Sequence, residues 1–415
     1  MEAILECCCG LDVHRDNVVA CLLKGPQDLK PEATLKTFSA LPNGLEELRT
    51  WLEEENCRHV AMESTGVYWQ PVYNVLEEAF DGTAIILVVN ARHMRNVPGK
   101  KTDMRDAEWI AQLLRSGLLN GSFIPSKPVR ELRDLTRYRK TMVEEVNSQK
   151  NRIEKFLQSG GFKLSSFLSD VFGVSGRAIM EHICEHGSIS AFTVEKLVKG
   201  RLRVKKDDIA LATRGNMSPH QKEFLTMLLK HLYQLELNIK EIDVNIEQTS
   251  KIFKTQLEQL DGIPGIDKVA AATILAEIGI DMNEFKTSAH ICSWAGLSPG
   301  NNESAGKKKS TRITKGNPYV KRIICQIAWC VTRMRNTYLS NWYWKVKQRR
   351  GGKKALIALA RKILTIIYSI LKNEENTYSE KMYEVLQERL AKQRQKKMVA
   401  ELEKSGFSVN YPHSA

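Results

Sequence analysis

Short apolar runs alternate with helical patterns over the first 120 residues, and this alternation restricts that part of the chain to an α/β fold. The first two runs are joined by a polar turn at residues 14–17, which predicts a hairpin. The expected order is three strands, helix, strand, helix, strand and helix, with strands at residues 3–11, 18–23, 33–38, 59–62 and 84–89. The last helix should begin near residue 102.

An antiparallel start followed by βαβ crossovers is typical of the ribonuclease H-like fold, which we expect for residues 1–125. In such a sheet the first strand is central and the fourth lies beside it. The sequence therefore predicts that the ends of these two strands are neighbours.

From Leu132 onward, apolar residues recur three and four apart in two long series, the second starting at Leu225. A period near 3.5 residues predicts a coiled-coil arm over residues 126–260, with a small helical insert at 159–219. Such an arm could join two protomers or pack within one chain.

Pro264 and Gly265 open a C-terminal helical domain that we place at residues 261–375. Its start, DGIPGIDKVAAATILAEIG, resembles a helix-hairpin-helix element, in which backbone amides of a glycine turn face a phosphate. A plain helical turn is the alternative. Residues 376–415 predict a charged helical tail with a frayed end.

Positive charge is segregated along the chain. The net charge is +14, from 62 Lys and Arg residues against 48 Asp and Glu residues. Residues 304–373 hold 18 Lys or Arg residues and no acid, which leaves 44 basic residues against all 48 acids elsewhere. This distribution favours binding to a phosphate backbone over a merely solvated basic face.

Other classes of protein are disfavoured. No run of about 18 apolar residues is free of charge, so we expect no membrane span. The N-terminal residues lack the basic region of a secretory signal. The nine cysteines form no CxxC pair, and three are adjacent in a predicted strand, which indicates reduced core thiols in a cytosolic protein.

Four acids stand where predicted strands end or a predicted helix begins: Asp12, Glu63, Asp103 and Asp106. Residues three apart share a helix face, so Asp103 and Asp106 can point to one spot. The expected sheet would bring Asp12 and Glu63 within one strand spacing, about 5 Å. Converging carboxylates repel one another unless cations offset their charge, and two Mg²⁺ ions about 3.5–4 Å apart are usual in phosphodiester cleavage.

Each acid also has an ordinary interpretation. Asp103 and Asp106 could stabilise a helix N terminus, which acids do by a few tenths to about 1 kcal/mol. Asp12 could belong to a sugar-kinase or chaperone-type ATPase, although the sequence lacks the glycine-rich phosphate loops of those folds. Glu63 alone could be a surface acid.

Residues 294–322, WAGLSPGNNESAGKKKSTRITKGNPYVKR, form a polar segment that we expect to be a loop. Small residues after Ser304 leave its hydroxyl accessible. A serine that attacks a phosphodiester needs nearby positive charge, which this segment supplies. No histidine lies close in sequence to take the proton, so the base must come from elsewhere. Ser298 and Ser310 are chemical rivals, and an ordinary loop serine is the simpler alternative.

Four segments carry a resemblance to a known family: GLDVH, ESTGVYW, KTDMRDAEWIAQLL and the serine segment. In this order they resemble the signatures of the bridge-RNA-guided DEDD transposases, the IS110 insertion-sequence family, from Asp12 to about Ile370. The resemblance assigns the acidic tetrad to Asp12, Glu63, Asp103 and Asp106, and the nucleophile to Ser304. The sequence departs from the family pattern at none of these positions.

The resemblance implies a RuvC-like N-terminal domain and a C-terminal domain whose serine becomes covalently joined to DNA. It implies a homo-oligomer, a dimer or tetramer, in which the acids of one subunit complete the serine site of another. It also implies a structured non-coding guide RNA that pairs with donor and target DNA.

We therefore expect a Mg²⁺-dependent transposase and DNA recombinase of a mobile element in the prokaryotic cytosol. The residues expected to bind nucleic-acid phosphates are Lys307, Lys308, Lys309, Arg312, Lys315 and Arg322. Two alternatives stay open. A Holliday-junction-type nuclease would use water with the same acids, and a non-catalytic protein would keep only the basic segment.

Overall fold

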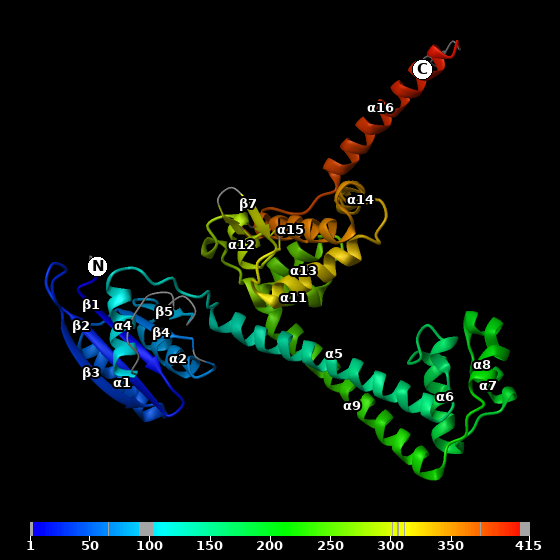
Figure 1. The fold of residues 1–415 in the computed structure, drawn as a ribbon, viewed down its shortest axis with the longest axis horizontal. Helices are drawn as coiled ribbons and strands as arrows, with labels where there is room; N and C mark the ends of the chain where they lie inside the picture. Colours follow the sequence, from blue (N-terminus) through cyan, green and yellow to red (C-terminus); the bar gives the residue numbers. More distant parts are fainter. Residues whose placement is uncertain are drawn as a thin grey trace. The chain divides into compact units, whose positions relative to one another are not determined.

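The computed structural model describes residues 3–64, 66–90, 103–300, 302–304, 307–310, 312–373 and 375–406. At residues 103–105, 302–304, 307–310, 382, 383 and 386 it describes the backbone alone. The chain divides into two compact units, Met1–Ile124 and Pro125–Ala415 (Figure 1).

Unit 1, Met1–Ile124, is built on a five-stranded sheet of order β3-β2-β1-β4-β5. The strands are β1 Cys7–Val13, β2 Asn17–Lys24, β3 Glu32–Ser39, β4 His59–Glu63 and β5 Ile85–Val89. The first three pair antiparallel, whereas β4 runs parallel to both β1 and β5. This order confirms the ribonuclease H-like fold.

The first strand starts later than predicted, at Cys7. The backbone amides of Ile4 and Leu5 donate instead to the carbonyl of Arg115, at 2.8 and 3.3 Å. The apolar residues before Cys7 therefore pack against a helix end and do not extend the sheet.

Helices cover both faces of the sheet. α1 (Pro42–Glu54) and α2 (Trp69–Phe80) pack on the face that includes Cys9, Leu11 and Val13 of β1. α4 (Asp103–Arg115) packs on the other face. Strand residues alternate between the two layers, so β1 and β4 are apolar on both sides.

Unit 2, Pro125–Ala415, contains the arm. Its helices α5 (Lys127–Ser159) and α9 (Pro219–Thr249) lie side by side (Figure 1). Gln149 donates to the Leu228 carbonyl at 2.8 Å, while Arg139, earlier on α5, pairs with Asp243, later on α9. The helices are therefore antiparallel, and the predicted apolar stripes face each other within one chain.

The insert between α5 and α9 is helical, as expected. It consists of α6 Val174–His186, α7 Ala191–Leu197 and α8 Lys206–Ala212. The insert also contains short 3₁₀ turns at Leu164–Ser166 and Gly200–Lys205, and two further 3₁₀ turns follow α9 at Ser250–Phe253 and Met282–Glu284.

The remaining elements are mostly helical: α10 Lys254–Asp261, α11 Lys268–Ile278, α12 Ser288–Trp294, β6 Asn302–Ser304, β7 Lys307–Ser310, α13 Pro318–Val331, α14 Tyr338–Arg350, α15 Gly352–Leu371 and α16 Lys381–Lys404. A turn at residues 262–267 joins α10 to α11, as both the helix-hairpin-helix and the plain-turn alternatives require, and Asp267 caps α11 by accepting from the Ala270 amide at 2.7 Å. α15 packs against α12, α13 and α14.

All nine cysteines are free thiols, and five of them are buried. No helix within the described ranges is both long and apolar enough to cross a membrane.

Candidate active site

Asp12 and Glu63 lie beside each other at the carboxyl ends of β1 and β4. Leu11 is opposite Met62 in the parallel ladder, and one further step places Asp12 beside Glu63. Neighbouring strands are about 4.8 Å apart. Asp12 is 7% exposed, and Glu63 is half-buried. The sequence prediction that the fold gathers these two acids is therefore met by the backbone register.

Both acids belong to the face of the sheet that α4 covers. Cys8 of β1 and Ala61 of β4 pack in one cluster with Ala107 and Ala111 of α4. Side chains alternate along a strand, so Asp12, four residues after Cys8, and Glu63, two after Ala61, fall on the α4 side.

α4 runs antiparallel to β1, which fixes where its first turn lies. The Cys8 thiol donates to the Ala111 carbonyl at 3.5 Å, and Gly10 approaches the backbone of Ala107. The step from Gly10 to Asp12 along β1 covers about 6.6 Å, and the step from Ala107 back to residue 103 along α4 covers about 6 Å. Because these two distances are nearly equal, residue 103 lies alongside Asp12.

Gly10 allows this close crossing. A Cβ atom at position 10 would lie 2.3 Å from the Ala107 carbonyl oxygen and 2.4 Å from the Ala111 nitrogen, both backbone atoms. We expect Gly10→Ala to lower the unfolding free energy of unit 1 by about 1–3 kcal/mol, because helix and strand must separate. Calorimetry of the whole chain measures this change. Gly121→Ala is the matched control, since its Cβ would meet only the flexible Leu87 side chain, at 3.0 Å. Equal stability of the two variants would contradict the close contact between β1 and α4 at Gly10.

The complete acidic tetrad stays a prediction. Asp106 is half-buried in the first turns of α4, but the side chain of Asp103 lies outside the described residues. Among the side chains that are described, no three His, Cys, Asp or Glu residues lie close enough together to hold a metal ion.

His14 is a neighbour of the site that the sequence interpretation missed. Its Nε2 lies 3.2 Å from Oδ2 of Asp12, an ion-pair distance when the imidazole is protonated. Its position two residues after Asp12 was the available signal, because alternate residues of an extended chain share a side. His14 can therefore orient the Asp12 carboxylate.

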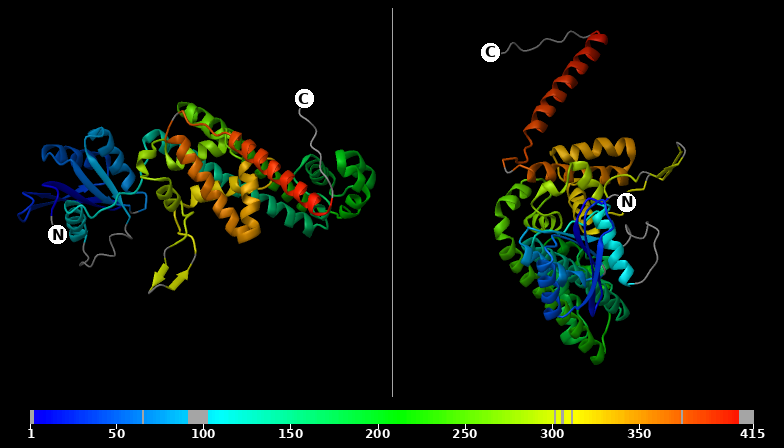
Figure 2. Two further views of the ribbon diagram at one scale, coloured as in Figure 1. Left: turned by 90° about the horizontal axis from the view of Figure 1, so that it is seen from above. Right: turned by 90° about the vertical axis from the view of Figure 1, so that its left-hand side faces the viewer.

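Ser304 lies in unit 2, at the end of β6. The segment expected to be a loop is a β-hairpin, in which Ser304 is opposite Lys307 and Asn302 is opposite Ser310. The two strands stand away from the helices of this unit (Figure 2). The side chains of Ser304, Lys307, Lys308 and Lys309 lie outside the described residues.

A stem of backbone contacts anchors this hairpin. The Gly300 amide donates to the Arg312 carbonyl at 2.8 Å, and Pro299 and Ile313 form a bridge. Below them, the Asn317 amide donates to the Trp294 carbonyl at 2.9 Å. The stem therefore joins the end of α12 to the start of α13.

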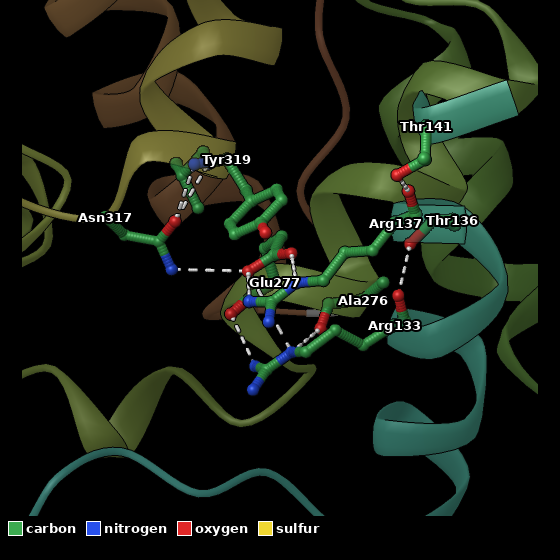
Figure 3. A network of polar contacts seen from close by, with 9 residues as sticks. Arg133, Thr136, Arg137, Thr141, Ala276, Glu277, Asn317 and Tyr319 are labelled. Carbon is green, nitrogen blue, oxygen red and sulfur yellow. Dashed lines mark hydrogen bonds and ion pairs between the residues drawn. The ribbon is translucent and has the colours of Figure 1, made fainter. Parts of the chain in front are cut away.

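A buried ionic network holds the base of this stem (Figure 3). Glu277 of α11 is 1% exposed and accepts two hydrogen bonds from Arg137 of α5, at 2.7 and 2.8 Å. The Asn317 side-chain amide donates to Glu277 at 3.2 Å. Its side-chain oxygen accepts from the Tyr319 and Val320 amides and so caps α13. Arg133 donates to the Ala276 and Glu277 carbonyls, at 2.8 and 2.9 Å. One carboxylate thus ties together α5, α11 and α13.

Burial and charge act against each other in this network. The pKa of Arg133 is lowered to about 10, chiefly by burial; the charge of Glu277 acts against this lowering, and the neighbouring Arg137 adds to it. Burial also disfavours charge on Arg137, but the hydrogen bonds and charge of Glu277 outweigh it and raise the pKa. Both guanidinium groups remain cations at neutral pH.

A cavity of about 330 Å³ lies next to the network, between α5, α11 and α13. Cations on its lining have acidic partners: Arg139 pairs with Asp243, and Lys140 and Arg322 both pair with Glu144. The cavity is therefore not a site of unbalanced positive charge.

The other residues expected to bind phosphate differ in setting. Arg312 and Lys315 are exposed at the end of the hairpin. Arg322 is 52% exposed, and its guanidinium lies 3.3 Å from Glu144.

Comparison with known proteins matches two separate stretches of the chain, the first of which continues from unit 1 into α5. A transposase family model matches residues 9–161, and a second model, described as the transposase IS116/IS110/IS902 family, matches residues 257–344. The chain is 26% identical to the "Probable family 20 transposase" of Pseudomonas aeruginosa, over 37% of this chain and 46% of that protein. It is 25% identical to the transposase for insertion sequence element IS1111A of Coxiella burnetii, over 38% of this chain and 44% of that protein.

These curated relatives are thus matched over about half of their length or less. Among solved structures, Thermus thermophilus RuvC aligns with 28% of this chain and 99% of its own, at 9% identity and a TM-score of 0.23. The two family models together cover more than half of the chain, which belongs to the IS110 family of transposases.

Proposed function

We propose that this chain is an RNA-guided DNA transposase and recombinase that cuts and rejoins DNA through Ser304 and a carboxylate metal site. The observation that carries the proposal is the placement of Asp12 and Glu63 side by side, on the face where α4 begins with Asp103. Family membership supports DNA as the substrate.

The acids suit Mg²⁺, because carboxylate oxygens are the ligands this ion prefers. Asp12, Glu63, Asp103 and Asp106 would hold two ions. When bound, the ions would supply Lewis-acid stabilisation of charge on the attacking and leaving oxygens. Burial of Asp12 strengthens its field, which favours a divalent partner.

Ser304 would act as the nucleophile. Its Oγ would form a bond to phosphorus while the bond from phosphorus to the leaving strand breaks. The serine proton would pass to a base in the carboxylate site of another subunit of a dimer or tetramer, and the leaving oxygen would take up a proton. The phosphoserine would conserve the bond energy for rejoining.

Guidance by a structured RNA fits a chain whose basic segment offers backbone contacts. Base pairing would read the donor and target DNA, while Lys307, Lys308, Lys309, Arg312, Lys315 and Arg322 would bind phosphates. The expected location remains the prokaryotic cytosol.

Asp12→Asn tests the proposal. We expect DNA strand transfer to fall by about 100-fold or more, since a metal site supplies several kcal/mol of charge stabilisation. A discrete RNA should co-purify with both the wild type and the variant. Asp16→Asn, on the exposed turn after β1, is the matched control and should retain full activity. Strand transfer that survives both Asp12→Asn and chelation of Mg²⁺ would refute metal catalysis, and a preparation free of discrete RNA would refute guidance.

A further inference from the structure

Helix α14 carries tryptophans beside lysines at its surface. Trp344 is 48% exposed, and the Lys347 ammonium lies 4.0 Å from its ring centroid. On the other flank, Lys362 of α15 lies 5.2 Å from the Trp342 ring and 5.0 Å from the Tyr338 ring. Tyr343, between the two tryptophans, is buried and provides the core contact.

The outward ridge of α14 between these flanks is basic. Lys345 and Arg349 are exposed and share one side of the helix, since they are four residues apart. We call Trp342, Trp344, Lys345, Lys347, Arg349 and Lys362 the α14 surface.

The cations of the α14 surface have no acidic partner in the described part of the chain, and residues 304–373 contain no acid. Cations on the arm of the same unit behave differently, since Arg137, Arg139 and Lys150 all form ion pairs with Glu or Asp. Cations at a helix C terminus gain from the helix dipole, which accounts for Lys347 and Arg349. It does not account for a half-exposed tryptophan beside them.

This combination matches one kind of partner. Unpaired cations attract phosphates, and exposed aromatic rings stack on bases. A base is available for stacking only where the strand is unpaired, because a duplex keeps its bases inside. A second copy of α14 would bring like charges together, which disfavours self-association through this surface.

We propose that the α14 surface binds an unpaired nucleic-acid strand, with one base stacked on Trp344 and phosphates on Lys345 and Arg349. This inference rests on the proposed function only in taking a nucleic acid as the partner. It requires neither Ser304 nor the acids of unit 1.

The test is fluorescence anisotropy with the full chain, freed of bound nucleic acid at high salt. The probes are labelled uridine and deoxythymidine oligomers of equal length, without Mg²⁺. Trp344→Ala should weaken binding of at least one oligomer by about 5- to 150-fold, the range for loss of one stacked base. Trp344→Phe should restore most of the affinity. A joint change of Lys345 and Arg349 to Ala should reduce the salt dependence of binding.

Phe192→Ala is the matched control. Phe192 is 66% exposed on α7 with the Lys196 ammonium 4.2 Å from its ring centroid, but it lies outside the acid-free block. It should bind both oligomers as the wild type does. A larger loss on uridine would assign the surface to an RNA, and a larger loss on deoxythymidine to an unpaired DNA strand; both support the proposal.

Three results would overturn it. One is unchanged affinity of Trp344→Ala for both oligomers, and another is an equal loss for a blunt DNA duplex. The third is a changed oligomeric state with unchanged affinity. Because binding is measured without catalysis, these outcomes stay distinct from failure of the Asp12→Asn test.

Discussion

Replacing Ser304 by Ala is expected to eliminate the covalent protein–DNA adduct and to lower strand transfer by about 1,000-fold or more, the scale for loss of a nucleophile. No other serine takes its place in the hairpin, because Ser310 is opposite Asn302, at the far end of β7 from Lys307. The measurement is the yield of labelled DNA that migrates with the protein on a denaturing gel.

Ser310→Ala and Ser298→Ala are the controls, and both should keep the adduct. An adduct that persists in Ser304→Ala and disappears in either control would move the nucleophile to that serine. Strand cleavage that continues in Ser304→Ala without any adduct would favour a nuclease that uses water.

Replacing Glu277 by Ala is expected to lower the unfolding free energy of unit 2 by about 3–5 kcal/mol. The substitution leaves Arg137 without its two charge-assisted hydrogen bonds and Asn317 without its acceptor. Native-state hydrogen exchange of α11 and α13 measures the loss where it occurs.

Glu144→Ala provides the comparison for that measurement. Glu144 also has two cationic partners, Lys140 and Arg322, but its side chain is 61% exposed. Water screens such a pair, so the expected change is within about 1 kcal/mol. Similar exchange rates in both variants would show that the buried network does not stabilise this unit.

Local sequence patterns predicted the sheet and the arm well. The run 18–23 is apolar on both faces and is buried on both, whereas the run 84–89 forms an edge strand in which Ile85 is 53% exposed. The placement of Asp12 and Glu63 followed from strand order, because in this topology β1 and β4 are neighbours whose carboxyl ends meet at one edge. The antiparallel path of α4 was not available from spacing, since it depends on the contact between Gly10 and Ala107.

The network around Glu277 was beyond local patterns. The single acid in the apolar helix KVAAATILAEI was an unused signal, because a carboxylate among apolar residues needs a partner. The partner, Arg137, is 140 residues away and is one of 62 basic residues. The hairpin was missed because lysine-rich segments have low strand propensity, and here the anchored stem imposes the pairing.

Because α5 and α9 pack against each other along their length, the arm has a fixed length. A helix of 31 residues is about 47 Å long, so the α6–α8 insert is carried at a set reach from α10. Removing seven residues from each helix would shorten that reach by about 10 Å and return every side chain to nearly the same side. The length of the arm and the residues on its surface can therefore vary independently of each other.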